Sequence, residues 1–118
     1  LVDVSHLSDG GFYDVAKISK KPFVATHSDC RALAAHPRNL TDDMIRLLAQ
    51  KGGVSGINFA PAFLDDTQGN NTSRISDMVR HVTLYRNWRR GLRWNWHRFR
   101  WYRGKSRGRR ARTAYTFI

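Results

Sequence analysis

The stretch KPFVATH, residues 21–27, combines a helix stop, a buried strand and a polar strand end. Pro22 ends any helix that precedes it, because its ring fixes φ and it has no backbone N–H to donate. Phe23–Thr26 is an apolar run with the composition of a buried β-strand. His27 follows directly, where that strand would end. The stretch therefore predicts a helix, a turn and a buried strand, in that order.

Two further apolar runs repeat the strand signal on either side. Leu1–Val4 precedes the central run and Val54–Phe59 follows it, and both have the length of strands. Strands that alternate with helices are typical of a parallel sheet with right-handed crossovers. Three such units are too few for a closed barrel or a complete doubly wound sheet. The sequence therefore predicts a piece of an α/β protein.

The helices between these runs are marked by capping residues. Ser8 or Asp9 can cap the first helix, and Thr41 can cap the second. A third helix is expected over Ser73–Tyr85, after a polar loop at Ala60–Thr72. The side chains expected to face the core share an apolar character and a helical spacing: Phe12, Val15, Ala16 and Ile18; Met44, Ile45, Leu47 and Leu48; Ile75, Met78, Val79 and Val82.

The charge divides the chain of 118 residues into two parts. Residues 1–86 hold ten Lys or Arg and nine Asp, whereas residues 87–118 hold eleven Lys or Arg, no acid and all four Trp. The net charge of +12 therefore lies almost entirely in the last 32 residues. We predict a folded segment over 1–86 and an irregular, disordered basic tail over 87–118. One cysteine, Cys30, excludes an internal disulfide framework and a Cys-rich zinc module.

Two histidines follow predicted strands at equivalent positions. His6 follows the first apolar run and His27 the second. Because the carboxyl ends of parallel strands share one edge of a sheet, these imidazoles could converge on one metal ion. Spacing alone favours the blander alternative of two surface or capped histidines. Arg38, in the loop before the second helix, could hold an anionic group with a bidentate fork or remain solvated.

The other candidate side chains are interpreted as structural. His36 and His81 do not follow a predicted strand, and His97 lies in the basic tail. Cys30 could be a thiolate nucleophile, but no base is paired with it in the sequence, so we expect a small buried residue.

The segment DVSHLS, residues 3–8, resembles the D-x-S-H-x-S segment of the renal (membrane) dipeptidase family of zinc peptidases. The resemblance continues in the same order over residues 21–28, 30–33, 36–43 and 52–59, and includes the 21-residue step from His6 to His27. It covers roughly residues 1–85. It implies that the chain is about three β/α units of a (β/α)8 TIM-type barrel that hydrolyses dipeptides with two zinc ions.

The same resemblance assigns roles to three side chains. His6 and His27 would be ligands of one zinc ion, and Arg38 would bind the terminal carboxylate of the dipeptide. Asp29 stands where Asn or Ser is more usual, which affects the surroundings of His27. The remaining ligands would belong to strands before Leu1, so we expect no catalytic residue here and no activity from this chain alone. A homodimer would be possible for the intact enzyme.

The family also carries a G-[IL]-G-[ST]-D-F-D-G strand after the third helix, and the tail lacks it as written. Trp is encoded only by TGG, so the overlapping codons that begin at Trp94, Trp96 and Trp101 all encode glycine. The codons around Arg98 and Arg100 allow Asp in that frame. The recovered string is compatible with G-I-G-T-D-F-D-G. We therefore interpret the tail as an out-of-frame translation that follows a frameshift between His81 and Trp88.

The alternative interpretation treats the tail as a selected binding module. Arginines that alternate with aromatic residues suit phosphate contacts and base stacking, or an anionic membrane surface. The tail has no signature of a nucleic-acid-binding motif, so no specific nucleic acid is expected. No apolar run is long enough to span a membrane and no signal peptide is visible, which favours a cytoplasmic location for a chain whose start at Leu1 looks truncated.

Overall fold

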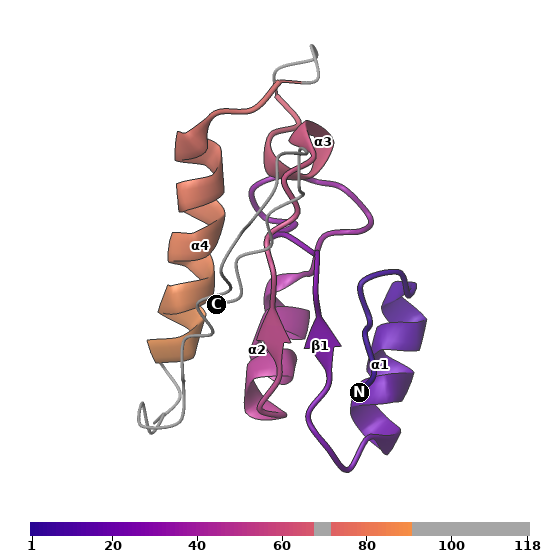
Figure 1. Cartoon of the computed structure of the whole chain (residues 1–118). Helices are drawn as coiled ribbons and strands as arrows, with labels where there is room; N and C mark the ends of the chain where they lie inside the picture. The colour runs from indigo at the N-terminus through magenta and orange to yellow at the C-terminus, as the bar shows by residue number, and fades with distance from the viewer. Residues whose placement is uncertain (68–71, 91–118) are drawn as a thin grey trace, which may run out of the picture.

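The computed structural model describes residues 1–67 and 72–90, so residues 91–118 of the tail, with any G-I-G-T-D-F-D-G equivalent, lie outside the described residues. The elements are α1 (Asp9–Ile18), β1 (Val24–Ala25), α2 (Asp42–Gln50), β2 (Val54–Ser55), α3 (Pro61–Leu64) and α4 (Ile75–Arg90). The alternation of strand and helix is the predicted α/β order. Figure 1 shows the two strands side by side, with α1 and α4 on opposite sides of them.

The strands are parallel, as predicted. Val24 pairs with Val54 and Ala25 with Ser55, and a parallel bridge joins Asp3 to Val24. The first apolar run therefore lies beside β1 as a third strand-like segment, with β1 in the centre. All three segments run in the same direction, so the residues that follow them gather at one edge of the sheet.

The helices begin where the capping residues predicted. The Ser8 hydroxyl accepts a hydrogen bond from Gly11 N, and the Thr41 hydroxyl accepts one from Met44 N. Each cap satisfies a backbone donor that the first helical turn leaves without a partner. Helix α2 contacts both α1 and α4, and in Figure 1 it lies between them.

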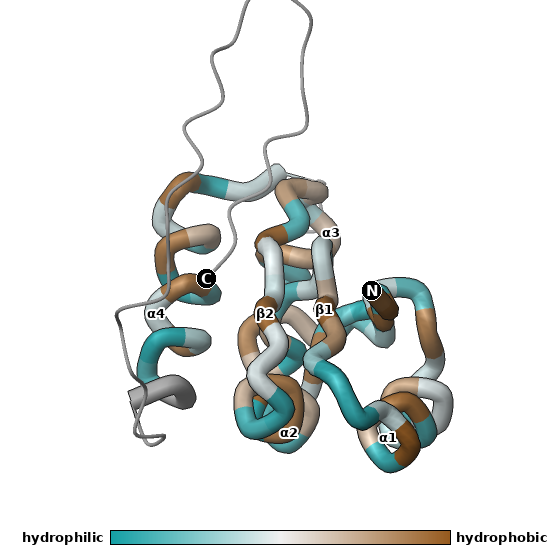
Figure 2. The backbone as a smooth tube through the Cα atoms, turned by 60° about the horizontal axis from the view of Figure 1, so that its bottom comes forward, coloured by the Kyte–Doolittle hydropathy of each residue, from teal (hydrophilic) through white to brown (hydrophobic). Residues whose placement is uncertain are grey.

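One core joins all of these elements. Phe23 and Ala25 of the central strand region are fully buried, and Phe12 of α1 packs edge-on against Phe23 with ring centroids 5.7 Å apart. The buried apolar side chains are Val4, Phe12, Ala16, Phe23, Ala25, Cys30, Leu40, Met44, Ile45, Leu48, Ile57, Leu64 and Tyr85. Figure 2 shows brown, apolar segments on both strands and on the helices around them.

The predicted core faces are wrong at three positions. Ile18 is 74% exposed, Ile75 79% and Val79 50%. Over residues 75–87 of α4, for which side-chain burial is described, the buried side chains are His81 and Tyr85, and Met78 and Val82 pack against the core. The buried face of α4 therefore includes a histidine and a tyrosine with polar partners. An apolar pattern alone does not reveal such a face.

The predicted loop at 60–72 also contains a short helix. Pro61 occupies the first turn of α3, where its missing N–H costs no hydrogen bond, and Leu64 enters the core. In Figure 1, α3 lies at the end of the molecule toward which the strands point. Within the residues that the structure describes, no helix has the length and apolarity needed to cross a membrane.

Candidate metal centre

His6 and His27 meet at the carboxyl edge of the sheet. Their Nε2 atoms lie 2.8 Å apart, and their ring centroids are 4.8 Å apart at an interplanar angle of 60°. The two side chains are separated by 21 residues in sequence, and the parallel pairing of Asp3 with Val24 brings them together. The two imidazoles therefore lie together, which the strand ends allowed but which spacing alone did not favour.

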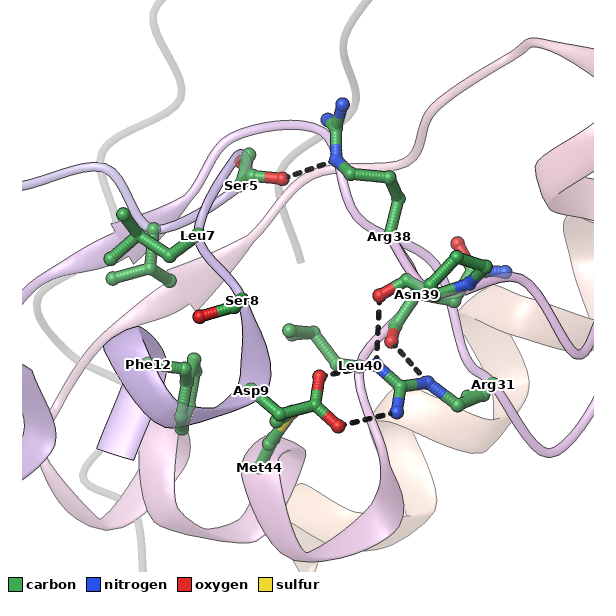
Figure 3. A pocket seen from close by; sticks show the side chains of 12 residues that line it. Ser5, Leu7, Ser8, Asp9, Phe12, Arg31, Arg38, Asn39, Leu40 and Met44 are labelled. Atoms are coloured by element: carbon green, nitrogen blue, oxygen red, sulfur yellow. Dashed lines mark hydrogen bonds and ion pairs between the residues drawn. The ribbon is translucent and has the colours of Figure 1, made fainter. Parts of the chain in front are cut away.

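Arg38 lies beside the same pair. Its Nε donates to the Ser5 carbonyl at 2.6 Å, and its Nη1 is 3.1 Å from His6 Nδ1. Figure 3 shows this bond from Arg38 to Ser5, with the end of the guanidinium group pointing away from the Asp9–Arg31 pair. The three residues that the sequence singled out thus form one cluster.

The Asp3 carboxylate binds the residues that neighbour the two histidines in sequence. Asp3 accepts hydrogen bonds from the backbone N–H and the hydroxyl of Ser5, and from the backbone N–H and the hydroxyl of Thr26. Burial would raise the pKa of Asp3, but the hydrogen bonds from Thr26 and Ser5 outweigh it and lower the pKa to about 2. Asp3 therefore ties the ends of two strands together as an ionised group.

Two further contacts orient His27. Its backbone N–H donates to the Ser5 hydroxyl at 3.1 Å, and its Nδ1 lies 2.7 Å from the Thr26 hydroxyl. Burial, and then the neighbouring His6, lower the pKa of His27, although Asp3 opposes the shift. The neutral imidazole that results is the form that can bind a metal ion.

Sequence reasoning missed Asp3 and Thr26 as members of this cluster. The available signal was their position, since each is a polar residue at the end of a predicted strand that carries one of the histidines. Their hydrogen bonds depend on the register between the first segment and β1, which the sequence pattern alone does not give.

Three buried residues nearby, Asp29, Cys30 and His81, have hydrogen-bond contacts with backbone groups. Asp29 is fully buried, its Oδ1 accepts from Asn58 N, and burial raises its pKa to about 7 even though that hydrogen bond lowers it. Cys30 is also fully buried, and burial raises the pKa of its thiol, so it remains a thiol as expected. His81 Nδ1 accepts from Cys30 N, and His81 Nε2 lies 3.0 Å from the Leu64 carbonyl.

The donors at the cluster suit a metal ion but do not complete its coordination. Imidazole nitrogens are common zinc ligands, and two of them face each other here. Within residues 1–67 and 72–90, no group of three or more His, Cys, Asp or Glu side chains is placed to hold a metal ion. A catalytic zinc site uses about three protein ligands, which is more than this pair of imidazoles offers.

These features define a class: a parallel α/β segment with a histidine pair and an arginine at the carboxyl edge of its sheet. The model of the membrane dipeptidase family, peptidase family M19, matches residues 1–88. The chain belongs to this family, as its resemblance to the family indicated. Within the solved structures, a metallopeptidase from Rhodobacter sphaeroides, liganded with a phosphinate mimic of the dipeptide L-Ala-D-Ala, has a TM-score of 0.70 at 35% identity.

This chain spans less than a third of the length of each relative described here. The match to the Rhodobacter enzyme covers 75% of this chain and 26% of that one. An uncharacterised protein of the pqqA 5′ region from Klebsiella pneumoniae is 43% identical over 82 residues, which is 69% of this chain and 30% of the relative. The dipeptidase verJ from Clonostachys rogersoniana is 37% identical over 82 residues, or 70% of this chain and 21% of the relative.

Proposed function

We propose that this chain is the segment of a zinc-dependent dipeptidase that supplies two ligands of one metal ion and the arginine that binds the substrate carboxylate. The observation that carries the proposal is the 2.8 Å approach of His6 Nε2 to His27 Nε2, with Arg38 Nη1 3.1 Å from the same His6 ring. Membership of the membrane dipeptidase family supports hydrolysis of a dipeptide as the reaction of the whole enzyme.

Each residue has a defined part in this proposal. His6 and His27 would hold a zinc ion through Nε2, and the ion would supply polarisation of the scissile carbonyl and activation of water. Arg38 would pair its planar fork with the terminal carboxylate of the dipeptide. The whole barrel would be the (β/α)8 architecture of which these units form about three. The described residues supply too few metal ligands for turnover, so we propose that the chain alone is inactive.

The alternative of a nucleic-acid or membrane-binding tail has no support from these findings. The family match ends at residue 88, and residues 91–118 lie outside the described residues. The histidine cluster, in contrast, belongs to the matched segment.

The proposal is tested by metal titration of the full chain. Calorimetry with Zn²⁺ should give binding that His6→Ala and His27→Ala each weaken at least about tenfold, because each removes one of two ligands. His36→Ala is the matched control, since it removes an imidazole outside the pair: its Nδ1 accepts from Arg38 N at 3.1 Å and its ring packs against Phe63 with centroids 4.3 Å apart. Equal affinity in the wild type and both alanine variants would overturn the proposed ligand pair.

A dipeptide hydrolysis assay tests the incompleteness of the site. The full chain with added Zn²⁺ should not hydrolyse L-Ala-D-Ala, the dipeptide whose mimic is bound to the Rhodobacter relative. Hydrolysis that disappears on His27→Ala would show that two ligands suffice and that the inactivity proposal is wrong.

A further inference from the structure

The cluster contains an unbroken series of polar contacts between a cation and an anion. Arg38 Nη1 lies 3.1 Å from His6 Nδ1, and His6 Nε2 lies 2.8 Å from His27 Nε2. His27 Nδ1 lies 2.7 Å from the Thr26 hydroxyl, which in turn donates to Asp3 Oδ2. Each ring nitrogen of both histidines is therefore within hydrogen-bonding distance of a defined neighbour.

The two ends of this series fix the direction of every hydrogen bond. A guanidinium N–H can only donate, and an ionised carboxylate can only accept. The Thr26 hydroxyl has a single proton and gives it to Asp3, so it can only accept from His27 Nδ1. At the other end, Arg38 can only donate to His6 Nδ1, which must carry a lone pair.

One assignment of protons satisfies both ends. His27 carries its proton on Nδ1 and a lone pair on Nε2. His6 carries a lone pair on Nδ1 and its proton on Nε2, which it donates to His27 Nε2. We infer that an ordered relay, Arg38 to His6 to His27 to Thr26 to Asp3, holds the two histidines in opposite tautomers.

The two tautomers differ in whether Nε2 carries the lone pair that a metal ion needs. This part of the inference rests on the proposed function of the histidine pair. His27 is already in the form that presents an Nε2 lone pair, and Thr26 and Asp3 are positioning residues for it. His6 is in the other form. For His6 Nε2 to coordinate, its proton has to move to Nδ1, and Arg38 Nη1 has to withdraw from that nitrogen.

This requirement couples the metal ligand to the substrate-binding arginine. In the observed arrangement Arg38 uses Nη1 on His6 and Nε on the Ser5 carbonyl. Coordination through His6 Nε2 frees the Nη1 donor, which can then turn to the carboxylate of a dipeptide. The tautomer of His6 therefore affects the Nη1 donor of Arg38, one part of a guanidinium group with five N–H donors.

The tautomers are measured directly in the full chain without metal. Long-range ¹H–¹⁵N spectra of the ¹⁵N-labelled, chelator-treated protein at neutral pH should show an unprotonated Nε2 for His27 and an unprotonated Nδ1 for His6. Thr26→Val should move His27 toward its Nε2–H tautomer, whereas Thr26→Ser, which keeps the hydroxyl, should retain the wild-type spectrum. Thr83→Val, the same change at an exposed threonine of α4, is the matched control.

The two readouts separate the relay from the proposed function. A His27 ring protonated on Nε2 in the wild type, or left unchanged by Thr26→Val, would overturn the relay. Addition of Zn²⁺ should move the His6 proton to Nδ1, and Thr26→Val should weaken zinc affinity about 10–100-fold while Thr26→Ser stays near wild type. Correct metal-free tautomers that zinc does not alter would refute the ligand role and leave the hydrogen-bond relay intact.

Discussion

The Tyr85 hydroxyl donates a hydrogen bond of 2.7 Å to the carbonyl of Ser28, across 57 residues of sequence. The same hydroxyl accepts from Ser55 Oγ at 3.1 Å, so one buried side chain links α4 to the segment after β1 and to β2. Burial raises the pKa of Tyr85 well above its ordinary value, and the phenol stays neutral and able to donate. Helix α4 is therefore integrated into the core as far as this residue.

Tyr85→Phe should lower the free energy of unfolding by about 1–3 kcal/mol, because it removes a hydrogen bond and leaves buried polar groups with fewer partners. Urea unfolding of the full chain measures the difference. Tyr13→Phe is the matched control, since the Tyr13 side chain is 43% exposed and its loss of a hydroxyl should change stability by less than about 0.5 kcal/mol. Equal effects of both variants would contradict the role of the Tyr85 hydroxyl.

Gly53→Ala should destabilise the fold strongly. A Cβ at this position would lie 2.3 Å from the Phe23 carbonyl oxygen and 2.5 Å from Leu48 Cδ1, and the backbone oxygen cannot move without displacing the central strand. We expect a loss of about 2–3 kcal/mol or more in unfolding experiments, typical of severe overpacking.

Gly10→Ala provides the comparison for that substitution. Gly10 is in α1, where a new Cβ would meet only Ser8 Oγ at 4.0 Å, and alanine favours a helix over glycine by about 1 kcal/mol. This variant should be neutral or more stable than the wild type. Destabilisation of both variants by a similar amount would show that steric contact at Gly53 is not the cause.

The strand–helix alternation, the parallel direction of the strands and two helix caps were predictable from the sequence pattern. The pairing of His6 with His27 was expected from the family resemblance, because spacing alone favoured two surface histidines. Thr41 caps α2 through its own hydroxyl, and His6 and His27 meet because both follow parallel strands. The face of α4 was not predictable in the same way. His81 and Tyr85 are buried through partners far away in sequence, at Cys30, Leu64, Ser28 and Ser55, and an apolar pattern assigns the inward face to Ile75 and Val79 instead.

Asp3→Asn should change the pH dependence of stability in a defined window. The folded pKa of about 2 lies below the ordinary aspartate value of 3.8, so the ionised carboxylate stabilises the fold above about pH 4 and loses that contribution as the pH falls toward 2. Asp3 is solvent-exposed, so solvent screening limits the contribution of its ionised carboxylate to the free energy of unfolding to about 1 kcal/mol.

Unfolding of the wild type and Asp3→Asn is therefore compared at pH 6 and at pH 2. The variant should be less stable at pH 6, and the difference should shrink at pH 2, where Asp3 of the wild type is itself partly protonated. Asp43→Asn is the control, because Asp43 is an exposed member of an ion pair with Arg46. A constant difference between wild type and Asp3→Asn across this range would contradict the role of the ionised carboxylate.

The change of composition at residue 87, within α4, leads to a prediction about the gene. The match to the family extends to residue 88, and Tyr85 still packs as part of the core, so a slip in reading frame would fall after Tyr85. Read one base later, the codons that begin at Trp94, Trp96 and Trp101 encode glycine by the genetic code alone, so the test of the slip lies in the codons between them.

The same prediction fixes individual codons. For that frame to read G-I-G-T-D-F-D-G, the Arg98 codon must end in GA, the Phe99 codon must be TTT and the Arg100 codon must be CGA. Sequencing the source DNA through this region measures them directly. Other codons at these positions would refute the frameshift. The alternative would then hold, in which the tail is a selected basic segment whose binding to anionic polymers should weaken steeply as the salt concentration rises.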